Sequence, residues 1–522
     1  MNRKRCMMVF VVLFLIFAQT AGASELVIGT MSEPSMDPHY LYLTTNIAYA
    51  KHIFGRLAGL DENIRLTPDL ALSWKTSDNL SWEFKLRQGV KFHDGSEFTA
   101  EDVVFSFSRV SNVPNNPASY INNLRGIAET SIVDPYTLMI RTDKPNPILP
   151  IQLHNIAIVS QKAAGKAGTD DFKSGKAAIG TGPYKFVEYI PGNRLVLQRN
   201  ENYWGEKPAF EKVTFRIFSN DETRTAALLG GTVDMIDFAP PFALEQLEKK
   251  NFKLFKCASD RIIFMACNTI KDSSPYITGK DGKPLAKNPL QDIRVRKALS
   301  QAIYRDALIQ MVMKGLAFPA SQLIPDGWYS HNPDLKVEKY DPDNARKLLA
   351  EAGYPDGFGL TIHGPNDRYV NDAKVCDAVA QMLAKIGLKT KVETMSKSEY
   401  FGKLSPPKNE FAFCLQGWGN ASAGESSQGL MALAHSYDKT KGTGSYNPGY
   451  SDAKADAAIE KAVATTDKDA REKMLREAMA TVINDYAIIP LYAQSVVVAS
   501  KKGIVYIPRS DEQTLAMNAR PE

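Results

Sequence analysis

The spacing of hydrophobic residues predicts a chain in which strands and helices alternate. Hydrophobic and polar residues alternate over Ser81–Leu86, which predicts a strand with one buried face. Apolar runs over Tyr184–Tyr189 and Arg194–Arg199 predict two strands that a Pro-Gly-Asn turn joins into a hairpin. Apolar residues recur at helical spacing over Ala373–Ile386, and Gly387 then ends the expected helix. The alternation continues through both halves of the chain, which indicates an α/β fold.

The second half is expected to be the more helical one. Apolar residues close to helical spacing predict one helix over Ile293–Met313. Toward the C-terminus, Ile488–Tyr492 and Ser495–Ala499 are expected to form two strands. In the first half, a helix is expected over Asp221–Leu229, because two glycines follow it directly.

The N-terminal segment has the pattern of a secretory signal peptide. Residues 3–5 are basic, and the apolar stretch 6–17 is too short to be a confident membrane span. Residues 21–23 read Ala-Gly-Ala, the small residues that precede a cleavage site, so we expect cleavage after Ala23. An uncleaved anchor is the alternative. The pattern therefore predicts an exported protein whose signal peptide is residues 1–23.

Composition narrows the function classes. A length of 522 residues suggests two to four folding units, and 44% hydrophobic with 23% charged residues is ordinary for a globular protein. The net charge of +5 is nearly balanced, so nucleic acid is not an expected partner. Beyond the signal peptide the cysteines are Cys257, Cys267, Cys376 and Cys414, which the sequence leaves as buried thiols or one bridge.

The sequence contains no recognisable catalytic constellation. None of its seven histidines lies in an H-E-x-x-H pattern, and there is no G-x-S-x-G nucleophile elbow. No C-x-x-C pair supports zinc or redox chemistry, and no phosphate-binding or dinucleotide loop is complete. A binding protein without a cofactor is therefore favoured over a secreted hydrolase.

Four segments in order resemble the family-5 solute-binding proteins of ABC importers, the peptide, nickel and opine binders. They are Ala71–Phe107, Ile179–Trp204, Asp292–Arg305 with Leu348–Gly353, and the Trp418 segment with Asn484–Tyr492. Together they span nearly the whole chain after residue 23. The aromatic residues of these motifs are also expected at core positions of strands, so the motifs indicate the fold and not the ligand.

The resemblance implies an α/β fold of the two-lobed periplasmic binding protein type, type II, with an extra subdomain in the first lobe. Two crossing strands would form the hinge, near Phe264–Thr269 and Ile489–Ala493. The first lobe is expected over 24–266 plus 493–522 and the second over 267–492. The extra subdomain is expected over 61–174, away from the cleft.

The resemblance also implies a function. A periplasmic receptor would capture a small peptide-like, amino-acid-derived or opine-like solute between its lobes and deliver it to the membrane permease of an ABC importer. The receptor is expected to be a monomer and not an enzyme. A nickel or metallophore receptor of the same fold is the alternative, although no histidine cluster supports direct chelation.

Candidate ligand residues lie in loops after strands of the second lobe. Arg368 follows the expected strand Leu360–His363, and its guanidinium could hold a carboxylate; solvent exposure or pairing with Asp367 is the alternative. Trp418 could supply an apolar wall or pack in the core. The resemblance implies an acidic residue shortly afterwards that would clamp an amine. The following acidic residue is Glu425, with Asn420 as a neutral substitute.

Four further residues complete the predicted site. Tyr446 and Asn447 lie in a glycine-rich loop that resembles a cleft-lining loop of the family, or else they stabilise the turn itself. Glu33 and Met36 follow the first strand, where the family often contacts its ligand. Glu33 could bind an amine, with a capping or solvated role as the alternative. No metal ligands are predicted.

Overall fold

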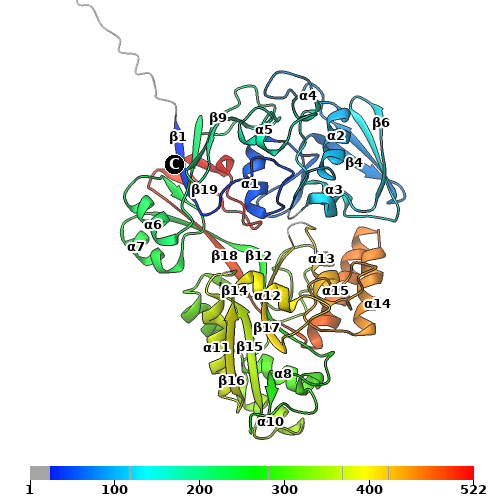
Figure 1. The fold of residues 1–522 in the computed structure, drawn as a ribbon, viewed down its shortest axis with the longest axis vertical. Helices are drawn as coiled ribbons and strands as arrows, with labels where there is room; N and C mark the ends of the chain where they lie inside the picture. Colours follow the sequence, from blue (N-terminus) through cyan, green and yellow to red (C-terminus); the bar gives the residue numbers. More distant parts are fainter. Residues whose placement is uncertain (1–23, 117–118, 280, 367, 421–422) are drawn as a thin grey trace, which may run out of the picture.

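The computed structural model describes residues 24–522 except 117–118, 280, 367 and 421–422. The signal peptide predicted over residues 1–23 lies outside the described residues. Figure 1 shows two lobes, one above the other, with the long strands β12 and β18 running between them. The predicted α/β, two-lobed fold is confirmed. The predicted lobe boundaries at 266/267 and 492/493 stay a prediction.

One mixed sheet extends through both lobes in the order β13-β15-β17-β12-β18-β11-β1-β10-β9-β8. The strands of the first lobe are β1 (Glu25–Thr30), β8 (Tyr184–Ile190), β9 (Arg194–Arg199), β10 (Lys212–Ile217) and β11 (Met235–Ile236). Those of the second lobe are β13 (Ile277–Thr278), β15 (Gly359–Pro365), β16 (Lys389–Met395), which pairs with β15, and β17 (Phe413–Gly419). In the first lobe β11 pairs with β18, and in the second β17 pairs with β12, so strands of both lobes border the crossing strands.

The crossing strands are β12 (Lys253–Cys267) and β18 (Ile488–Ser500), with the short β14 (Ala317–Pro319) beside β18. They pair antiparallel, and their register shifts between Ala258 and Ile262. Before the shift, Phe255 packs against the core of the first lobe; after it, Ile263 belongs to the core of the second. The irregular register thus lies where the chain passes from one core to the other. The two strands predicted at the C-terminal end are one continuous strand, β18.

Helices cover the sheet on both lobes (Figure 1). Those before β12 are α1 (Thr44–Ile53), α2 (Ala100–Val110), α3 (Leu149–Leu153), α4 (Gln161–Ala164), α5 (Thr169–Lys173), α6 (Asp221–Leu229) and α7 (Leu244–Lys249). Those after it are α8 (Ile293–Ala302), α9 (Arg305–Ala307), α10 (Pro342–Glu351), α11 (Asp372–Ala384), α12 (Lys397–Leu404), α13 (Ser427–Gly429), α14 (Ala453–Ala464) and α15 (Lys468–Asn484). In α11 the apolar stripe buries Val375, Val379 and Leu383 at helical spacing, as predicted.

The single helix predicted over Ile293–Met313 is wrong. Helix α8 ends at Ala302, and Ile303 has extended backbone angles, φ −88° and ψ 111°. The Arg305 side chain is buried at this break and donates hydrogen bonds to the carbonyls of Ser300 and Ile303 at 3.2 and 3.3 Å. Those donors satisfy carbonyl groups that a continuing helix would have paired with backbone N–H groups.

The extra subdomain contains a four-stranded sheet with the order β4-β5-β7-β6, and nearby hairpins complete the first lobe. Its strands are β4 (Ala71–Thr76), β5 (Ser81–Leu86), β6 (Ile127–Asp134) and β7 (Thr137–Thr142), while β2 (Ala58–Leu60) pairs with β3 (Leu66–Pro68) and β19 (Ile504–Tyr506) with β20 (Ala519–Pro521). On β5, the alternation buries Trp82, Phe84 and Leu86 in the subdomain core, as predicted.

The expectation that this subdomain lies away from the cleft is wrong. A cavity of about 280 Å³ is lined by residues of the subdomain, among them Lys144 and Gln152, and by Ser427 and Met431 of the second lobe. The subdomain therefore forms one wall of the space between the lobes. The sequence pattern could not reveal this, because it carries no information on which surface of the subdomain faces the other lobe.

All four cysteines of the described chain are free thiols. Cys257 is half-buried, while Cys267, Cys376 and Cys414 are buried. Burial raises the pKa of the Cys257 thiol to about 11 and that of Cys267 to about 12, so both are protonated at neutral pH. Within the part of the chain that the structure describes, no helix has the length and apolar character needed to span a membrane.

Candidate functional site

Four strands from the two lobes end close to the crossing strands. In the first lobe β1 ends at Thr30 and β11 at Ile236, and in the second β15 ends at Pro365 and β17 at Gly419. Residues that follow strand ends are those that contact ligands in open α/β sheets. The candidate site consists of the loops after these strands and the segment after β19.

The wall on the first lobe is built around a buried carboxylate. Thr30 Oγ1 donates a hydrogen bond to Asp237 Oδ2 at 2.7 Å, and the backbone N–H of Met31 donates to Oδ1 at 3.2 Å. Tyr49 donates from its hydroxyl to Thr30 Oγ1 at 3.0 Å. Burial raises the pKa of Asp237 to about 6. Thr30, Tyr49 and Asp237 line a shallow hollow together with Glu512, so polar groups and a second carboxylate share this wall.

Glu512 carries a negative charge to the boundary between the lobes. Its carboxylate accepts hydrogen bonds from Nε and Nη2 of Arg261 on β12 at 3.2 and 2.9 Å. Burial acts to raise the pKa of Glu512, but the Arg261 guanidinium, with a further contribution from Arg368, holds that pKa below its ordinary value. Glu512 has a left-handed backbone, φ 60°, which costs energy for a residue other than glycine. Strained backbone of this kind is concentrated at functional sites.

Arg368 lies in the loop between β15 and α11, as predicted, and its side chain is exposed. The Asp372 carboxylate fixes this loop by accepting hydrogen bonds from the backbone N–H groups of Arg368 and Tyr369 at 2.9 and 3.0 Å. The Tyr369 hydroxyl donates to the Gly417 carbonyl at 3.2 Å, which ties the loop to the end of β17. The Arg368 guanidinium lies 5.2 Å from the centre of the Tyr369 ring and contributes to the field at Glu512. The exposed guanidinium is thus available to an anionic group, and its charge acts on Glu512 of the first lobe.

Trp418, Asn420 and Tyr446 come together at the other side of β17. Trp418 is half-buried, and its Nε1 donates to Asn420 Oδ1 at 3.2 Å. The ring of Tyr446, which is 44% exposed, lies with its centre 5.6 Å from that of Trp418. Asn420 is fully buried, and its amide donates to the Leu323 carbonyl at 2.7 Å. The two aromatic rings can therefore meet a solute, while Asn420 mainly orients Trp418.

Glu425 is buried and already paired. Nε of Arg471 donates to Glu425 Oε2 at 3.0 Å, Nη2 donates to Oε1, and both side chains are 4% exposed. Arg471 also donates to the carbonyls of Ala462 and Thr465 at 3.0 and 3.1 Å. The pair therefore joins the loop after β17 to the turn between α14 and α15. The amine-binding role predicted for Glu425 would require this ion pair to break.

Asn447 is occupied within its own loop. Its amide donates to the carbonyls of His435 and Tyr450, both at 2.8 Å. Its Oδ1 accepts from the backbone N–H groups of Gly449 and Tyr450 at 2.7 and 2.6 Å. These contacts agree with the alternative role given for Asn447, which is to stabilise its own turn. Its neighbour Tyr446 is the member of this pair that reaches the surface.

Glu33 and Met36 lie away from the aromatic group. The Glu33 carboxylate accepts hydrogen bonds from the Tyr189 hydroxyl at 2.6 Å and from the Gly192 backbone at 2.7 Å, which joins the first loop to the β8–β9 hairpin. Met36 is 3% exposed and packs in the core of the first lobe. The structure thus brings together Trp418, Asn420 and Tyr446 from the predicted set and does not join them to Glu33 or Met36.

Sequence reasoning missed Glu512, Arg261 and Asp237. These three residues lie in segments that contain no recognisable motif. In addition, Glu512 and Arg261 are 251 positions apart in the sequence. One local signal was available for Asp237: it is the residue that directly follows the short strand β11. Within the described ranges, no three His, Cys, Asp or Glu side chains gather in a way that could hold a metal ion.

Comparison with known proteins agrees with this architecture. The sequence model of the bacterial extracellular solute-binding proteins, family 5, matches residues 65–441. The glutathione-binding protein GsiB of Salmonella paratyphi A is 31% identical over 497 residues, which cover 92% of this chain and 91% of that protein. GsiB of Escherichia coli K12 is 29% identical over 498 residues, with the same coverage of 92% and 91%.

Solved structures share the fold along nearly the whole chain. HbpA2 from Haemophilus parasuis superposes with a TM-score of 0.82 at 25% identity, covering 95% of this chain and 100% of its own. The periplasmic binding protein DppA from Helicobacter pylori, in complex with the peptide STSA, gives 0.75 at 25% identity, covering 96% and 99%. The family model thus matches more than half of the chain, and a relative that is 31% identical covers 92% of it. The chain therefore belongs to family 5 of the bacterial extracellular solute-binding proteins.

Proposed function

We propose that this protein is the periplasmic receptor of an ABC importer and that it binds a small peptide-like or amino-acid-derived solute through a carboxylate held by Arg368. The observation that carries this proposal is the exposed Arg368 side chain in the loop after β15, whose charge acts on the Glu512 carboxylate of the first lobe. A guanidinium suits a carboxylate solute, because it can donate two parallel hydrogen bonds to it. The aromatic pair of Trp418 and Tyr446 supplies an apolar surface for its middle.

The proposed mechanism is closure of the lobes around the solute. The crossing strands β12 and β18 are the only places where the main sheet is continuous between the lobes in the described chain, so they act as the hinge. A solute favours closure only if it makes contacts in the closed form that the open form lacks. Arg368 on one lobe and the hollow beside Asp237 on the other would supply such contacts. The closed form would then dock on the membrane permease.

The relatives narrow the solute class. Proteins named glutathione-binding match this chain over nearly its full length, and the DppA structure holds a peptide. Glutathione is itself a peptide-like molecule with free carboxylates, so it fits a site built around a guanidinium. The proposal includes export by cleavage after Ala23, a monomeric state and the absence of enzymatic activity.

Mass spectrometry of solutes that co-purify with the protein from its native host tests the proposal directly. We expect a peptide-like or amino-acid-derived carboxylate, bound with one molecule per chain. Titration calorimetry with glutathione, dipeptides and nickel salts then compares the solute classes. Binding of nickel ions alone, without a carboxylate ligand, would replace the peptide-like solute by the metal alternative. Turnover of a bound solute would contradict the receptor role.

A further inference from the structure

The cavity between the extra subdomain and the second lobe has walls from both bodies. Its volume is about 280 Å³. The subdomain contributes the segments that contain Arg125 and Lys144, together with Gln152 of α3, and the second lobe contributes Ser427 and Met431. Because both bodies form the walls, the cavity changes shape when the lobes move. A ligand that binds in it would therefore also affect closure.

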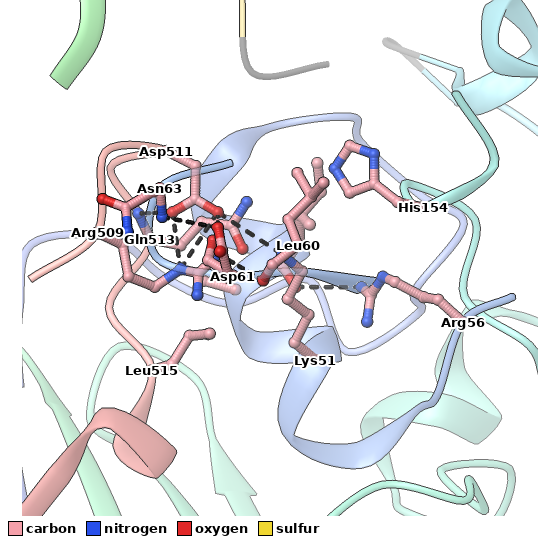
Figure 2. Close-up of polar contacts among 12 residues, drawn as sticks. Lys51, Arg56, Leu60, Asp61, Asn63, His154, Arg509, Asp511, Gln513 and Leu515 are labelled. Atoms are coloured by element: carbon pink, nitrogen blue, oxygen red, sulfur yellow. Dashed lines mark hydrogen bonds and ion pairs between the residues drawn. The ribbon is translucent and has the colours of Figure 1, made fainter. Parts of the chain in front are cut away.

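The subdomain is fixed to the rest of the first lobe, so its wall of the cavity moves with that lobe. Arg509 of the C-terminal segment donates from Nη2 to the carbonyls of Leu60 and Asp61 at 3.1 and 2.9 Å, where the subdomain begins (Figure 2). Arg109 on α2 donates from Nη1 and Nη2 to the Asp37 carboxylate at 2.8 and 2.7 Å. This second contact joins the subdomain to the loop after β1. The cavity therefore opens and closes with the two lobes.

Two contacts bring the second lobe directly against the subdomain. A Cβ atom added to Gly442 would lie 3.3 Å from Nη1 of Arg125, so the guanidinium lies close to the loop that carries Tyr446. A Cβ atom added to Gly424 would clash with Cδ1 of Ile151 on α3. Gly424 belongs to the loop after β17. The cavity therefore adjoins both loops of the second lobe that flank the aromatic pair of the proposed solute site.

The walls of the cavity carry hydrogen-bond donors without partners. Among the described residues, the Arg125 guanidinium and the Lys144 ammonium make no hydrogen bond or ion pair. Ser427 is 3% exposed, yet its hydroxyl has no partner within the described ranges. Gln152 accepts through Oε1 from Nδ2 of Asn146 at 2.9 Å, while its own amide N–H groups are free in the part of the chain that the structure describes. A cavity with unpaired donors suits a ligand group that only accepts, such as a carboxylate.

The charged residues that line the cavity leave a positive excess. They are Arg125, Asp143, Lys144 and Arg471. Glu425 neutralises Arg471 in the buried ion pair described above. Two cations, Arg125 and Lys144, therefore remain against the carboxylate of Asp143. Among the described residues, that carboxylate lies within ion-pair distance of neither cation.

The charges next to the cavity do not remove this excess. In the second lobe, Lys441 beside Gly442 pairs with Glu460 at 3.6 Å. Asp438 and Lys439 of the same loop carry opposite charges. These four charges cancel, so the adjoining loop is neutral as a whole.

Apolar side chains complete the lining. They are Ile148 of the subdomain with Met431 and Val463 of the second lobe. Pockets that enclose a whole ligand begin at about 300 Å³, so this cavity suits one end of a solute. Donors and apolar walls together fit a carboxylate that is carried on an aliphatic stem.

We propose that this cavity is a second anion-binding site of the receptor, in which Arg125 and Lys144 hold a carboxylate that the solute carries on an aliphatic stem. This inference rests on the proposed function and narrows its solute class to peptide-like molecules with two carboxylates, one at Arg368 and one in the cavity. Charge-assisted hydrogen bonds of this kind are stronger than neutral ones. Because Ser427 belongs to the opposite wall, the second carboxylate would contact both lobes and favour the closed form.

The test compares the full-length mature protein with Arg125→Gln and Lys144→Gln, and uses Arg141→Gln, an exposed position on β7, as the matched control. Titration calorimetry measures the affinity for glutathione, which has two carboxylates. It also measures the affinity for the dipeptides Ala-Glu and Ala-Gln, which have the same shape and differ by one carboxylate.

We expect the wild type to bind Ala-Glu more tightly than Ala-Gln. Arg125→Gln should bind glutathione and Ala-Glu about tenfold more weakly, the lower end of the effect of losing a hydrogen bond to a charged group, because Arg125 is exposed to water. Lys144→Gln should weaken them about threefold, as is typical of an exposed charge pair. The affinity of both variants for Ala-Gln should match that of the wild type, and Arg141→Gln should match it for all three peptides.

Asp143→Asn provides a readout of opposite sign. The substitution removes the carboxylate that repels the bound anion, so it should strengthen binding of glutathione and Ala-Glu about threefold. Added salt should weaken glutathione binding more in the wild type than in Arg125→Gln, because the variant has lost one of the screened charges. A purely structural role of this wall would give neither result.

Three outcomes would overturn the inference: unchanged glutathione affinity in Arg125→Gln, equal weakening of Ala-Glu and Ala-Gln, or weaker glutathione binding in Asp143→Asn. Titration with inorganic phosphate alone separates a free anion from a group of the solute. Phosphate binding that Arg125→Gln removes, at unchanged peptide affinity, would assign the cavity to a free anion and contradict the solute role. A wild-type protein that binds none of these peptides and co-purifies with no peptide-like carboxylate would instead overturn the proposed function.

Discussion

Glu512 and Arg261 lie 251 positions apart in the chain, yet their side chains are joined by two charge-assisted hydrogen bonds of 3.2 and 2.9 Å. Arg261 belongs to the crossing strand β12, and Glu512 to the C-terminal segment of the first lobe. The pair therefore ties the hinge to the wall of the candidate site. Its side chains are 15% and 14% exposed, so the charges are largely removed from water.

Replacement Glu512→Gln should destabilise the protein at pH 7 by about 3 kcal/mol, because it leaves the Arg261 charge without its partner. Arg261 holds the pKa of Glu512 below its ordinary 4.5 against the effect of burial. This contribution to stability is therefore present above pH 4.5 and is lost as the pH falls through the lower, folded-state pKa. Urea unfolding at pH 7 and pH 3 measures the difference between wild type and variant. A difference that does not shrink in acid would contradict the pairing argument.

Replacement Arg368→Ala should weaken binding of a carboxylate solute about ten- to a hundredfold, because a hydrogen bond to a charged group is lost. Arg368→Lys should recover only part of the affinity, since an ammonium lacks the planar fork of a guanidinium. Calorimetry with glutathione or with the solute identified by mass spectrometry gives the comparison. The exposed Arg346→Ala, on α10, is the control. Unchanged affinity in Arg368→Ala would remove Arg368 from the site.

Trp418 should report solute binding by fluorescence. Its ring is half-buried beside Tyr446, so a solute that lies against it changes its exposure to water. We expect intrinsic fluorescence to change on binding in the wild type and to lose most of that change in Trp418→Phe. Trp82, buried in the subdomain core, provides the control in Trp82→Phe, which should keep the signal. A full signal in Trp418→Phe would place the solute elsewhere.

Glu425→Gln separates a structural role from a binding role. Because Glu425 and Arg471 form a buried ion pair, the substitution should lower the free energy of unfolding by about 3 kcal/mol. Solute affinity of the folded variant should change by less than about threefold, which corresponds to well under 1 kcal/mol. Urea unfolding and calorimetry measure the two effects. Glu472→Gln, in a more exposed pair with Arg476, is the control. Lost affinity at unchanged stability would restore Glu425 to the predicted ligand set.

The sequence predicted those features that depend on local spacing. The strand Ser81–Leu86 and the helix Asp221–Leu229 have the predicted bounds, because alternation and a terminal glycine pair are local signals. The prediction of one helix over Ile293–Met313 was wrong because the break depends on a contact that is distant in sequence. Its break depends on Arg305, whose Nε donates to the Pro490 carbonyl at 2.8 Å across 185 positions. No spacing rule within the helix could reveal that partner.

The same difference between local patterns and distant contacts explains which residues of the candidate site could be predicted. Arg368 and Trp418 were found because they follow strands, which is a local pattern. Whether a polar side chain in such a loop is available depends on its partners, and those are distant: Glu425 pairs with Arg471 across 46 positions. The side-chain partners of Asn447 are nearer in sequence, at His435, Gly449 and Tyr450. Sequence alone could name the loops of the site but could not show which of their side chains were already satisfied.

The C-terminal segment is bound to the beginning of the chain, and this fixes an order of folding. Arg509 donates to the carbonyl of Leu60 at 3.1 Å, and the backbone N–H of Ala516 donates to His52 Nε2 at 3.0 Å. These contacts close loops of 449 and 464 residues. The second lobe has its own core, which is complete once β18 is made. The core that contains α1 also includes residues 504–519, so it is complete only after the final residues are made. Although its residues are synthesised first, the first lobe is thus completed last.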